Sequence, residues 1–547
     1  MSYNNNKPLF FLFIVTVIML VPNLGILPVN IMEARNFITA REMVQDNHWF
    51  LTTLNEEPRY EKPPLPTWIT ALVGFFFGFD SVFVLRLAVV CITLLLVIYI
   101  YIFSIKIGFS NKSSFHNGLI VITSFYIYFA GRDNQWDMYC HSFMIISIFY
   151  LWGILKKNKY PLKNAIWGGL CLAFSLLSKG PVSLYALLLP FLIAYGIVYK
   201  YKFKGEKKYN LALILYCFLG LGIGMSWSAY IHWADPEPLA KMAKIETSRW
   251  TNEYNSRPIY YYWSFFVQSG VWAVSALLAL LYPYMKNKVF NLKLYKFTLL
   301  WTLLSLILLS IIPEKKVRYI LPTLIPLALN TGFYIDYLWN HFRKLQSKKD
   351  QYLAIFNFGL LGTIGILYPL ILYFVFRKYI INQTSWMIIS SIILFFIGIG
   401  ILFFLLYKKF NQVFYWIIAL QCSVMSFAFP LAKSFLYNPN YKSAKNLRHY
   451  MDPKIDLYDF KNMTPEIVWD YGKKIPTIDL SEIDNILKKN NKMGLLCQSE
   501  NTSEIIKLID RSYKVNKVSY IDLNIVPPNN KGYKSRLERD FLIISKK

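Results

Sequence analysis

Long runs of apolar residues, separated by short polar stretches, recur along the chain as far as residue 430. A helical run of about 20 apolar residues crosses the roughly 30 Å hydrocarbon core of a bilayer. The pattern therefore predicts about thirteen membrane-spanning helices, at residues 9–21, 81–107, 116–130, 138–155, 165–177, 182–199, 210–229, 260–285, 297–312, 319–339, 352–376, 385–407 and 413–430. No small-residue cleavage pattern follows the first run, so we expect it to remain as an uncleaved helix.

Basic residues concentrate in alternate connections between these spans. The richer set lies at residues 7, 106–112, 156–163, 200–208, 286–296, 343–349 and 408–409. Because Lys and Arg in short loops mark the cytoplasmic side of a membrane, we expect a cytoplasmic N-terminus. An odd number of spans then places the C-terminus in the periplasm of a multi-pass protein of the bacterial inner (plasma) membrane.

The chain changes character at residue 431, after which no apolar run is long enough to span a bilayer. Short apolar segments at 455–458, 494–497 and 541–545 predict strands, and residues 503–511 predict a helix between strands. We therefore expect an all-α transmembrane domain at 1–430, whose first periplasmic loop covers 27–80. A small soluble α/β domain in the periplasm would follow at 431–547.

Composition supports a membrane protein and argues against other classes. Hydrophobic residues make up 55% of the 547 positions and charged residues only 16%, and the mean hydropathy is +0.35, so membrane lipids are expected neighbours. The net charge of +28 comes from loop clusters without any nucleic-acid motif, so no nucleic acid is expected as a partner. The six cysteines lack the CxxC spacing of a thiol or zinc site.

Charged residues also gather in connections predicted to lie outside. Apolar residues at helical spacing in 31–44 predict an interfacial helix that carries Glu33 and Arg35 on different faces. Two prolines after Glu61 and Lys62 would hold that stretch extended. Short outer turns add Arg132, Asp133, Asp137, Lys179 and the charges of residues 314–318. Any one of these could be an ordinary loop charge, but together they indicate a functional site at one membrane face.

Several of these segments form an ordered series of motifs. They read Glu33-Ala34-Arg35, Tyr60-Glu61-Lys62-Pro63-Pro64-Leu65, Arg132…Asp137, Leu177-Ser178-Lys179-Gly180-Pro181 and Tyr319-Ile320-Leu321-Pro322. From residue 32 to 326 the chain resembles the polyprenyl-phosphate-sugar-dependent membrane glycosyltransferases. That family includes the relatives of protein O-mannosyltransferases and the 4-amino-4-deoxy-L-arabinose lipid A transferases. The C-terminal domain carries no motif of this family.

The resemblance implies a GT-C type fold with a cavity facing the periplasm, and a sugar transferred from a polyprenyl-phosphate donor to a lipid or glycan acceptor. A lipid A modification with 4-amino-4-deoxy-L-arabinose or a related sugar fits this family. Lys62 would hold the carrier phosphate, Tyr319 would contact it, and Asp137 would face the same cavity. Glu61 would sit beside the phosphate, and since some relatives bind a metal there, a divalent metal near Glu61 is the one cofactor the resemblance allows; no metal site is read from the sequence itself.

Electrostatics adds further candidates for substrate binding. Displacement of a polyprenyl phosphate leaves growing negative charge on the phosphate, so cations aimed at it are the main requirement. Candidates for this role are Lys62, Arg35, Lys179 and Arg318, and Arg59 and Arg132 of the outer loops are further candidate substrate-binding residues.

The chain departs from the family at the start of the first loop, where relatives often have Asp-Glu and this sequence has Met32-Glu33. The missing Asp is the family's favoured catalytic base. A base is needed only when the acceptor is a neutral hydroxyl, because a phosphate acceptor is already ionised. Either Glu33 or Asp137 takes the catalytic role, or no base is needed.

A multi-helix transporter is the alternative from another class of protein. Transporters usually show internal repeats and ionisable groups near mid-membrane. This sequence shows no evident repeat, and its charges gather at one face, which favours the glycosyltransferase.

Overall fold

The computed structural model describes residues 7–201, 207–251, 256–344, 347–377, 379–380, 383–436, 438–451, 455–509 and 513–547. The chain divides into two compact units. The helical unit comprises Met1–Leu24, Tyr60–Pro66 and Phe83–Pro430, and the mixed unit comprises Gly25–Arg59, Thr67–Val82 and Leu431–Lys547. Lys202, Lys204 and Arg511, which entered the predictions above, lie outside the described residues.

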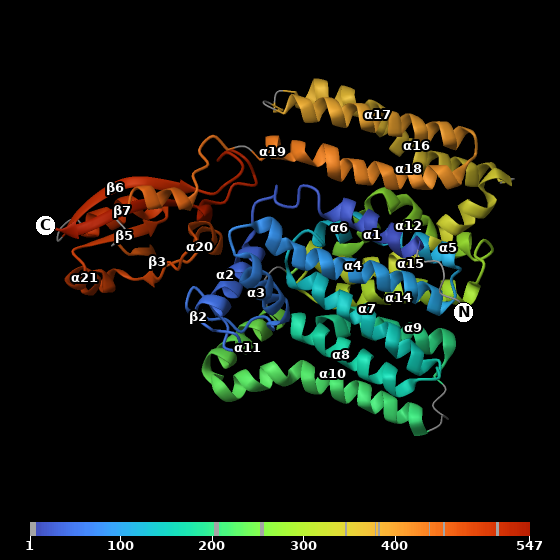
Figure 1. Ribbon diagram of the computed structural model, residues 1–547, viewed down its shortest axis with the longest axis horizontal. Coiled ribbons are helices and arrows are strands. Elements are labelled where there is room, and N and C mark those ends of the chain that lie inside the picture. The colour runs from blue at the N-terminus through green and yellow to red at the C-terminus, as the bar shows by residue number, and fades with distance from the viewer. Residues whose placement is uncertain are drawn as a thin grey trace. The chain divides into compact units, whose positions relative to one another are not determined.

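Helices dominate the helical unit, and many of them run side by side (Figure 1). Its α-helices are α1 (Lys7–Leu20), α4 (Val82–Ile107), α5 (Asn111–Thr123), α6 (Phe125–Ala130), α7 (Trp136–Leu155), α8 (Pro161–Lys179), α9 (Leu189–Tyr199), α10 (Lys207–Ala234), α11 (Pro236–Thr251), α12 (Ala273–Leu280), α13 (Tyr282–Met285), α14 (Leu292–Ile311), α15 (Leu321–His341), α16 (Lys348–Ile371), α17 (Thr384–Leu406) and α18 (Phe410–Ser423). Short 3-10 turns include Ile259–Tyr262, Phe265–Trp272 and Val317–Ile320, and π-helical turns include Leu184–Leu188, Leu372–Phe376 and Val424–Ala428.

Each predicted span coincides with a helix or with a run of consecutive helices. Within the described residues, eight helical segments are long and apolar enough to cross a membrane, and three shorter apolar helices accompany them. Two predicted spans are interrupted. The span at 116–130 breaks at Ser124, whose ψ of 126° is extended, and the span at 260–285 breaks at Gly270, whose φ of 64° is a left-handed conformation that glycine tolerates.

Glycines let α8 and α10 approach each other closely. A Cβ atom at Gly220 or Gly224 would lie 2.3 Å and 2.6 Å from the side chains of Leu172 and Leu176. Small residues four apart are the usual device for tight helix contact in a membrane. On its other side α8 packs on α7, where the Ser147 hydroxyl donates to the Gly168 carbonyl at 2.8 Å. The end of α8 is therefore held firmly beside the start of α7.

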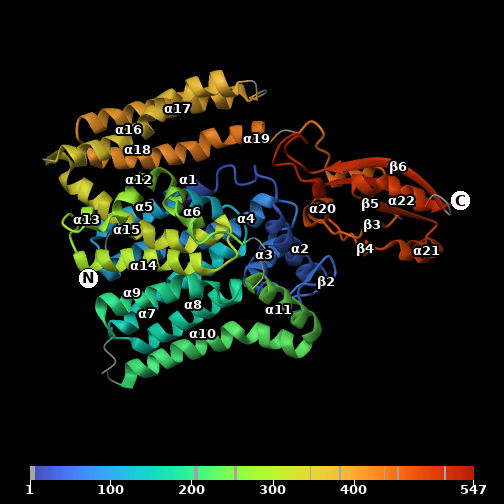
Figure 2. The same ribbon diagram turned by 180° about the vertical axis from the view of Figure 1, so that it is seen from behind.

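A five-stranded sheet forms the centre of the mixed unit (Figure 2). The strands lie in the order β4 (Thr477–Ile478), β3 (Leu457–Phe460), β5 (Lys492–Cys497), β7 (Glu538–Lys546) and β6 (Tyr513–Asp522). Strand β3 pairs in parallel with β4 and β5, whereas β7 pairs antiparallel with β5 and β6. The helices of this unit are α2 (Ile31–Gln45), α3 (Leu65–Phe77), α19 (Ala432–Phe435), α20 (Pro465–Tyr471), α21 (Leu480–Lys489) and α22 (Thr502–Ile509), and a short hairpin joins β1 (Thr53–Leu54) to β2 (Glu57–Pro58).

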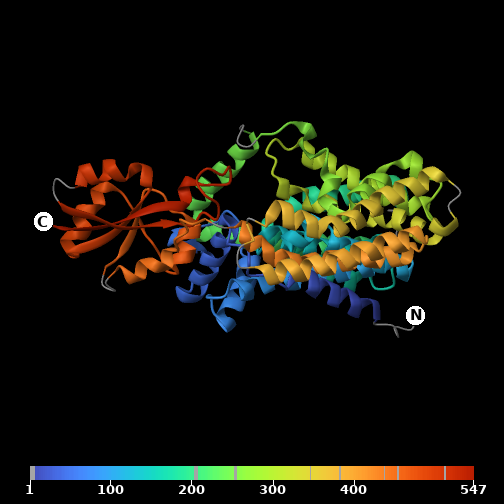
Figure 3. The same ribbon diagram turned by 90° about the horizontal axis from the view of Figure 1, so that it is seen from above.

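Alternating residues of the central strands feed two apolar cores on opposite faces of this sheet, and Figure 3 shows helices on both sides of the strands. Along β5, Leu495 belongs to the core shared with α21 and α22, while its neighbour Leu496 belongs to the core shared with α20. Ile38 of α2 is fully buried in the second core. A helix of the first loop thus completes the hydrophobic core of the C-terminal segment.

Polar contacts fix the same junction between the first loop and the C-terminal segment. The Asn55 side chain donates to the Ile475 carbonyl at 2.7 Å and accepts from the Ile475 amide at 2.8 Å. Lys474 forms ion pairs with Asp46 at 3.2 Å and Glu56 at 2.8 Å. The rings of Phe37 and Trp469 lie 5.0 Å apart. We call these contacts the loop seam; they explain why two regions distant in sequence form one unit.

Candidate functional site

A buried ion pair joins the start of α7 to the end of α8. Asp137 is the second residue of α7 and Lys179 is the last residue of α8, and the Lys179 ammonium donates to the Asp137 carboxylate. Only 10% of the Asp137 side chain and 8% of the Lys179 side chain are exposed. The helix dipole favours an anion at an N-terminus and a cation at a C-terminus, so both charges also suit their positions on their own helices.

The turn before α15 brings two more predicted residues to this pair. The Lys179 Nζ lies 5.2 Å from the centroid of the Tyr319 ring, within the range of a cation–π contact. The guanidinium carbon of Arg318 lies 5.7 Å from the same centroid. Among the described residues the buried Nε of Arg318 has no hydrogen-bond partner.

The same turn is anchored by its own contacts. Lys316 forms an ion pair with Glu314 at 2.5 Å, and the Tyr262 hydroxyl donates to the Lys316 carbonyl at 2.9 Å. These contacts hold the segment that carries Arg318 and Tyr319 in place. We call Asp137, Lys179, Arg318 and Tyr319 the helix-end cluster.

A cavity of about 50 Å³ opens beside the helix-end cluster. Asp137 and Arg318 line it together with Tyr126, Phe129, Ala130, Asp133, Gln135, Met138 and Leu321. The Gln135 amide donates to the Asp133 carboxylate, so the cavity wall carries a second oriented acid. One water needs roughly 10–15 Å³ of such space, so only a small end group of a ligand enters this cavity.

Sequence reasoning did not single out Tyr126 and Gln135 as site residues. Gln135 directly precedes α7 as its N-cap residue, next to the predicted motif, and that position was the available signal. Tyr126 lies inside an apolar run, where nothing in the sequence distinguishes it from a core aromatic residue.

Arg132, another predicted ligand of the substrate, is directed elsewhere. Its guanidinium donates to the carbonyls of Met19, Leu20 and Pro22 at 3.2, 2.8 and 2.8 Å. The last carbonyls of a helix lack partners within that helix. Arg132 therefore closes the C-terminal end of α1, and the structure does not bring it to the helix-end cluster.

Glu61 and Lys62 belong to the helical unit and follow an anchored tyrosine. The Tyr60 hydroxyl donates to Asp235 at 2.6 Å, and its ring lies 6.2 Å from that of Trp227 in α10. Burial and this hydrogen bond raise the pKa of Tyr60 far above its usual value, so the phenol stays protonated as a donor. Glu61 and Lys62 are half-buried directly after this anchor.

Glu33, Arg35 and Arg59 belong to the mixed unit. Asn30 caps α2 by accepting from the amides of Met32 and Glu33, and its own amide lies 3.4 Å from the Glu33 carboxylate. The buried Arg59 donates to the Arg35 carbonyl at 3.4 Å and to the Thr39 hydroxyl at 3.1 Å. The helix predicted at residues 31–44 is confirmed as α2. Within the mixed unit, Glu33 and Arg59 make contacts that stabilise this helix.

The described residues contain no group of three His, Cys, Asp or Glu side chains arranged to hold a metal ion. A divalent ion held by a single carboxylate and a substrate phosphate would need no such group. The metal expected near Glu61 therefore stays a prediction.

The sequence of this chain is similar to those of several known membrane transferases. Residues 61–222 match the family model described as dolichyl-phosphate-mannose-protein mannosyltransferase. The undecaprenyl phosphate-alpha-4-amino-4-deoxy-L-arabinose arabinosyl transferase of Wigglesworthia glossinidia brevipalpis is 26% identical over 345 residues, which cover 60% of this chain and 59% of that protein. Such a transferase from Proteus mirabilis is 26% identical over 348 residues, 62% of this chain and 61% of its own length. The matches thus span less than two thirds of those relatives.

A solved structure extends the likeness to nearly the whole chain. The crystal structure of ArnT from Cupriavidus metallidurans bound to undecaprenyl phosphate superposes with a TM-score of 0.71 at 15% identity, covering 99% of this chain and 98% of that one. The predicted fold class is confirmed: this is a multi-pass membrane protein of the GT-C type with a small C-terminal α/β region. Its sequence likeness is to the membrane glycosyltransferases that use polyprenyl-phosphate sugars, which confirms the resemblance predicted from the motifs.

Proposed function

We propose that this protein is a glycosyltransferase that moves a sugar from a polyprenyl-phosphate carrier to an acceptor at the periplasmic face of the inner membrane. The observation that carries the proposal is the helix-end cluster, in which a buried acid–base pair, a free arginine donor and a tyrosine meet beside a cavity. The names of the relatives support 4-amino-4-deoxy-L-arabinose or a related sugar as the group transferred, and the family resemblance of the motifs is the basis for lipid A as the proposed acceptor.

The chemistry of the step fits the charges of the cluster. The bond between the sugar's anomeric carbon and the phosphate oxygen breaks while the acceptor oxygen bonds to that carbon, and the electron pair leaves with the phosphate. Fixed cations that face the leaving phosphate stabilise this charge. Lys179 and Arg318 of the helix-end cluster are proposed as such cations, and Lys62 is proposed to hold the carrier phosphate from the motif match.

The Asp137–Lys179 ion pair also affects which carboxylate can accept the proton of a hydroxyl acceptor. The Asp137 carboxylate already accepts from Lys179, and a carboxylate paired with an ammonium is a weak proton acceptor. This contact supports a positioning role for Asp137, with Lys179 as the proposed cation. Glu33 is then the proposed base for a hydroxyl acceptor, and a phosphate acceptor requires neither residue as a base.

Lys62 provides the direct test of donor binding. We expect Lys62→Ala to lose transfer while the protein still inserts into membranes, and Lys62→Arg to lose much of it, because a planar fork replaces a compact charge. Lys163→Ala, at an exposed lysine in the first turn of α8, is the matched control. The assay follows transfer from undecaprenyl-phosphate-linked aminoarabinose to lipid A by mass spectrometry, and normal turnover by Lys62→Ala would remove Lys62 from the site.

Reconstituted vesicles separate the proposal from its rival. Protein that transfers no sugar from any polyprenyl-phosphate donor, yet moves solute across the vesicle wall, would identify a transporter. Lipid and glycan mass spectra of cells with and without the gene would show which acceptor changes.

The orientation is part of the proposal. A phosphatase reporter fused after Lys547 should be active, and one fused at Lys204, which lies outside the described residues, should be inactive. The opposite pattern would reverse the proposed topology.

A further inference from the structure

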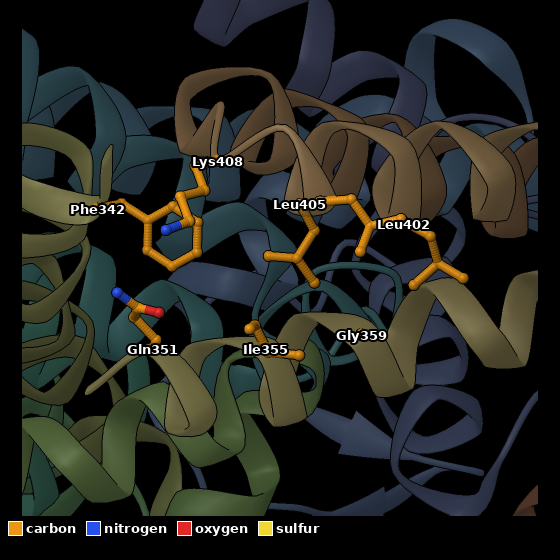
Figure 4. A pocket seen from close by; sticks show the side chains of 8 residues that line it. Phe342, Gln351, Ile355, Gly359, Leu402, Leu405 and Lys408 are labelled. Carbon is orange, nitrogen blue, oxygen red and sulfur yellow. The ribbon is translucent and has the colours of Figure 1, made fainter. Parts of the chain in front are cut away.

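A second cavity, of about 210 Å³, lies beside α16 and α17 in the helical unit (Figure 4). Ile355 and Gly359 of α16 line it together with Leu402 and Leu405 of α17. Its other lining residues are Leu406 at the end of α17, Phe342 after α15, Gln351 in the second turn of α16, and Lys408 after α17. Figure 4 shows Phe342, Gln351 and Lys408 together at one end. We call this the α16–α17 cavity; it is apolar along the helices and polar at one end.

Glycines explain why the cavity exists. A Cβ atom at Gly398 would lie 2.6 Å from the Gly362 carbonyl oxygen, so the backbones of α16 and α17 touch at that level. One turn along α16, a Cβ atom at Gly359 would meet nothing closer than a Leu405 methyl group at 3.6 Å. The helices therefore separate from their contact toward Gly359, and the absence of a side chain there leaves the groove open.

Positive charge surrounds the polar end. Five exposed basic residues lie in the adjoining turns: Arg343, Lys348, Lys349, Lys408 and Lys409. In the part of the chain that the structure describes, none of the five forms an ion pair with a carboxylate. Asp350, the acid of the same region, is already bonded to Lys288 at 2.7 Å, Tyr284 at 2.8 Å and Tyr337 at 2.9 Å. The local charge is therefore available to an anion.

We propose that the α16–α17 cavity binds an anionic phospholipid of the surrounding bilayer. One acyl chain lies along Ile355, Gly359 and Leu402, and the phosphate lies beside Lys408. Both helices belong to segments long and apolar enough to cross a membrane, so a lipid chain can reach the groove from the hydrocarbon core. Basic pockets at the ends of membrane helices select anionic over zwitterionic headgroups. This site is independent of the proposed transfer reaction.

The test measures lipid binding to the full-length purified protein by native mass spectrometry. Dioleoylphosphatidylglycerol and dioleoylphosphatidylethanolamine are titrated separately, so that the two probes share acyl chains and differ in headgroup charge. Gly359→Leu fills the groove with a better helix former, and Gly222→Leu, at a helical glycine facing open space, is its matched control. Lys408→Gln removes the charge of the Lys408 side chain, and Lys163→Gln, in the first turn of α8, removes the charge of an exposed lysine elsewhere.

We expect one phosphatidylglycerol to bind more tightly than phosphatidylethanolamine. Lys408→Gln should weaken phosphatidylglycerol binding about fivefold, the factor contributed by one lysine near an anionic headgroup. Gly359→Leu should remove the tight site, and both controls should bind as the unaltered protein does. Equal binding of the two lipids, or a phosphatidylglycerol preference that survives both variants, would overturn the proposal. Displacement of the bound lipid by undecaprenyl phosphate at lower concentration would identify the carrier as the occupant and would overturn it too.

Discussion

Both units bury an aspartate against a basic side chain, Asp137 with Lys179 in the helical unit and Asp459 with Arg539 in the mixed unit. The two pairs differ in what their donors do. Arg539 makes five hydrogen bonds, to Asp459, Thr464 and the carbonyls of Arg536, Glu538 and Asn462, which match its five N–H groups. Among the described residues Lys179 makes one, to Asp137, which itself lines a cavity, and two N–H donors of Lys179 stay unused.

The contrast separates a pair that holds a fold together from a pair that can serve a ligand. Every donor of Arg539 is used by neighbouring strands and turns, so the guanidinium has no capacity left for another partner. The helix-end cluster keeps unused donors on Lys179 and Arg318. Burial alone therefore does not distinguish the two pairs; the unused hydrogen-bonding capacity of the helix-end cluster is what makes it the candidate site.

The largest effect on activity is expected from Lys179→Met. Lys179 is proposed to face the leaving phosphate, and loss of such a cation should lower the rate of sugar transfer by about 10² to 10³. Initial rates in detergent, normalised to the amount of folded protein, give the measurement, with Lys163→Met as control. A near-normal rate would mean that Lys179, like Arg539, has a purely structural role, and would contradict the difference drawn between the two ion pairs.

Arg539→Met should act on stability instead. Removal of one partner from a buried ion pair costs about 3–5 kcal/mol, and the loss should appear at pH 8 as faster hydrogen exchange in β5 and β7. Lys517→Met is the control, because Lys517 is 52% exposed where it pairs with Asp540 and should cost below about 1 kcal/mol. Equal effects of the two variants would contradict the structural role assigned to Arg539.

The pH dependence of the mixed unit follows from Asp459. Burial raises the pKa of Asp459 to about 7, although the Arg539 charge opposes the shift, and the second oxygen of Asp459 has no partner among the described residues. Between its unfolded pKa near 4 and its folded pKa, the folded state holds the extra proton, so stability falls as pH rises through this window.

We expect the free energy of unfolding of the mixed unit to fall by up to about 1.4 kcal/mol per pH unit between pH 4 and 7. Exchange rates of the sheet amides, corrected for the intrinsic effect of pH, give the slope. Asp459→Asn should flatten it. A slope that persists in Asp459→Asn must arise from another group.

The smallest effect concerns the loop seam. Asn55→Ala removes two buried hydrogen bonds to Ile475 and should destabilise the mixed unit by about 1–3 kcal/mol. Asn530→Ala is a control at an exposed turn and should change stability by less than about 0.5 kcal/mol. Protease resistance of residues 455–547 reports the difference, and unchanged resistance in Asn55→Ala would mean that the apolar contacts alone hold the seam.

Much of this architecture could be predicted because apolar length and periodicity encode it directly. The spans, the helix α2 and the strands β3, β5 and β7 follow from local patterns. Strand β6 was not predicted because it lies at the sheet edge and alternates polar residues such as Lys514, Asn516 and Lys517 with few buried ones. Strand β4 has only two residues, too few to form a pattern.

Only some residues of the candidate site could be predicted from the sequence. Charges at predicted outer turns led to Asp137, Lys179 and Arg318, and the motif resemblance led to Tyr319; the structure brings these four residues together. The partners of Arg132 are carbonyls more than a hundred residues away in the chain, and backbone groups carry no sequence signal. The placement of Ile38 in the core of the C-terminal segment was unpredictable for a similar reason, since any apolar face of α2 could equally have lain on lipid.

The loop seam sets an order of events during synthesis. Asn55 and Ile475 are separated by 420 positions, so at about 5–20 residues per second the ribosome needs roughly 20 to 80 s to supply the second after the first. Throughout that interval α2 is complete but lacks the core that buries Ile38. The mixed unit is therefore the last part of the molecule to mature, and a nascent chain halted anywhere before β7 would carry an unfinished first loop.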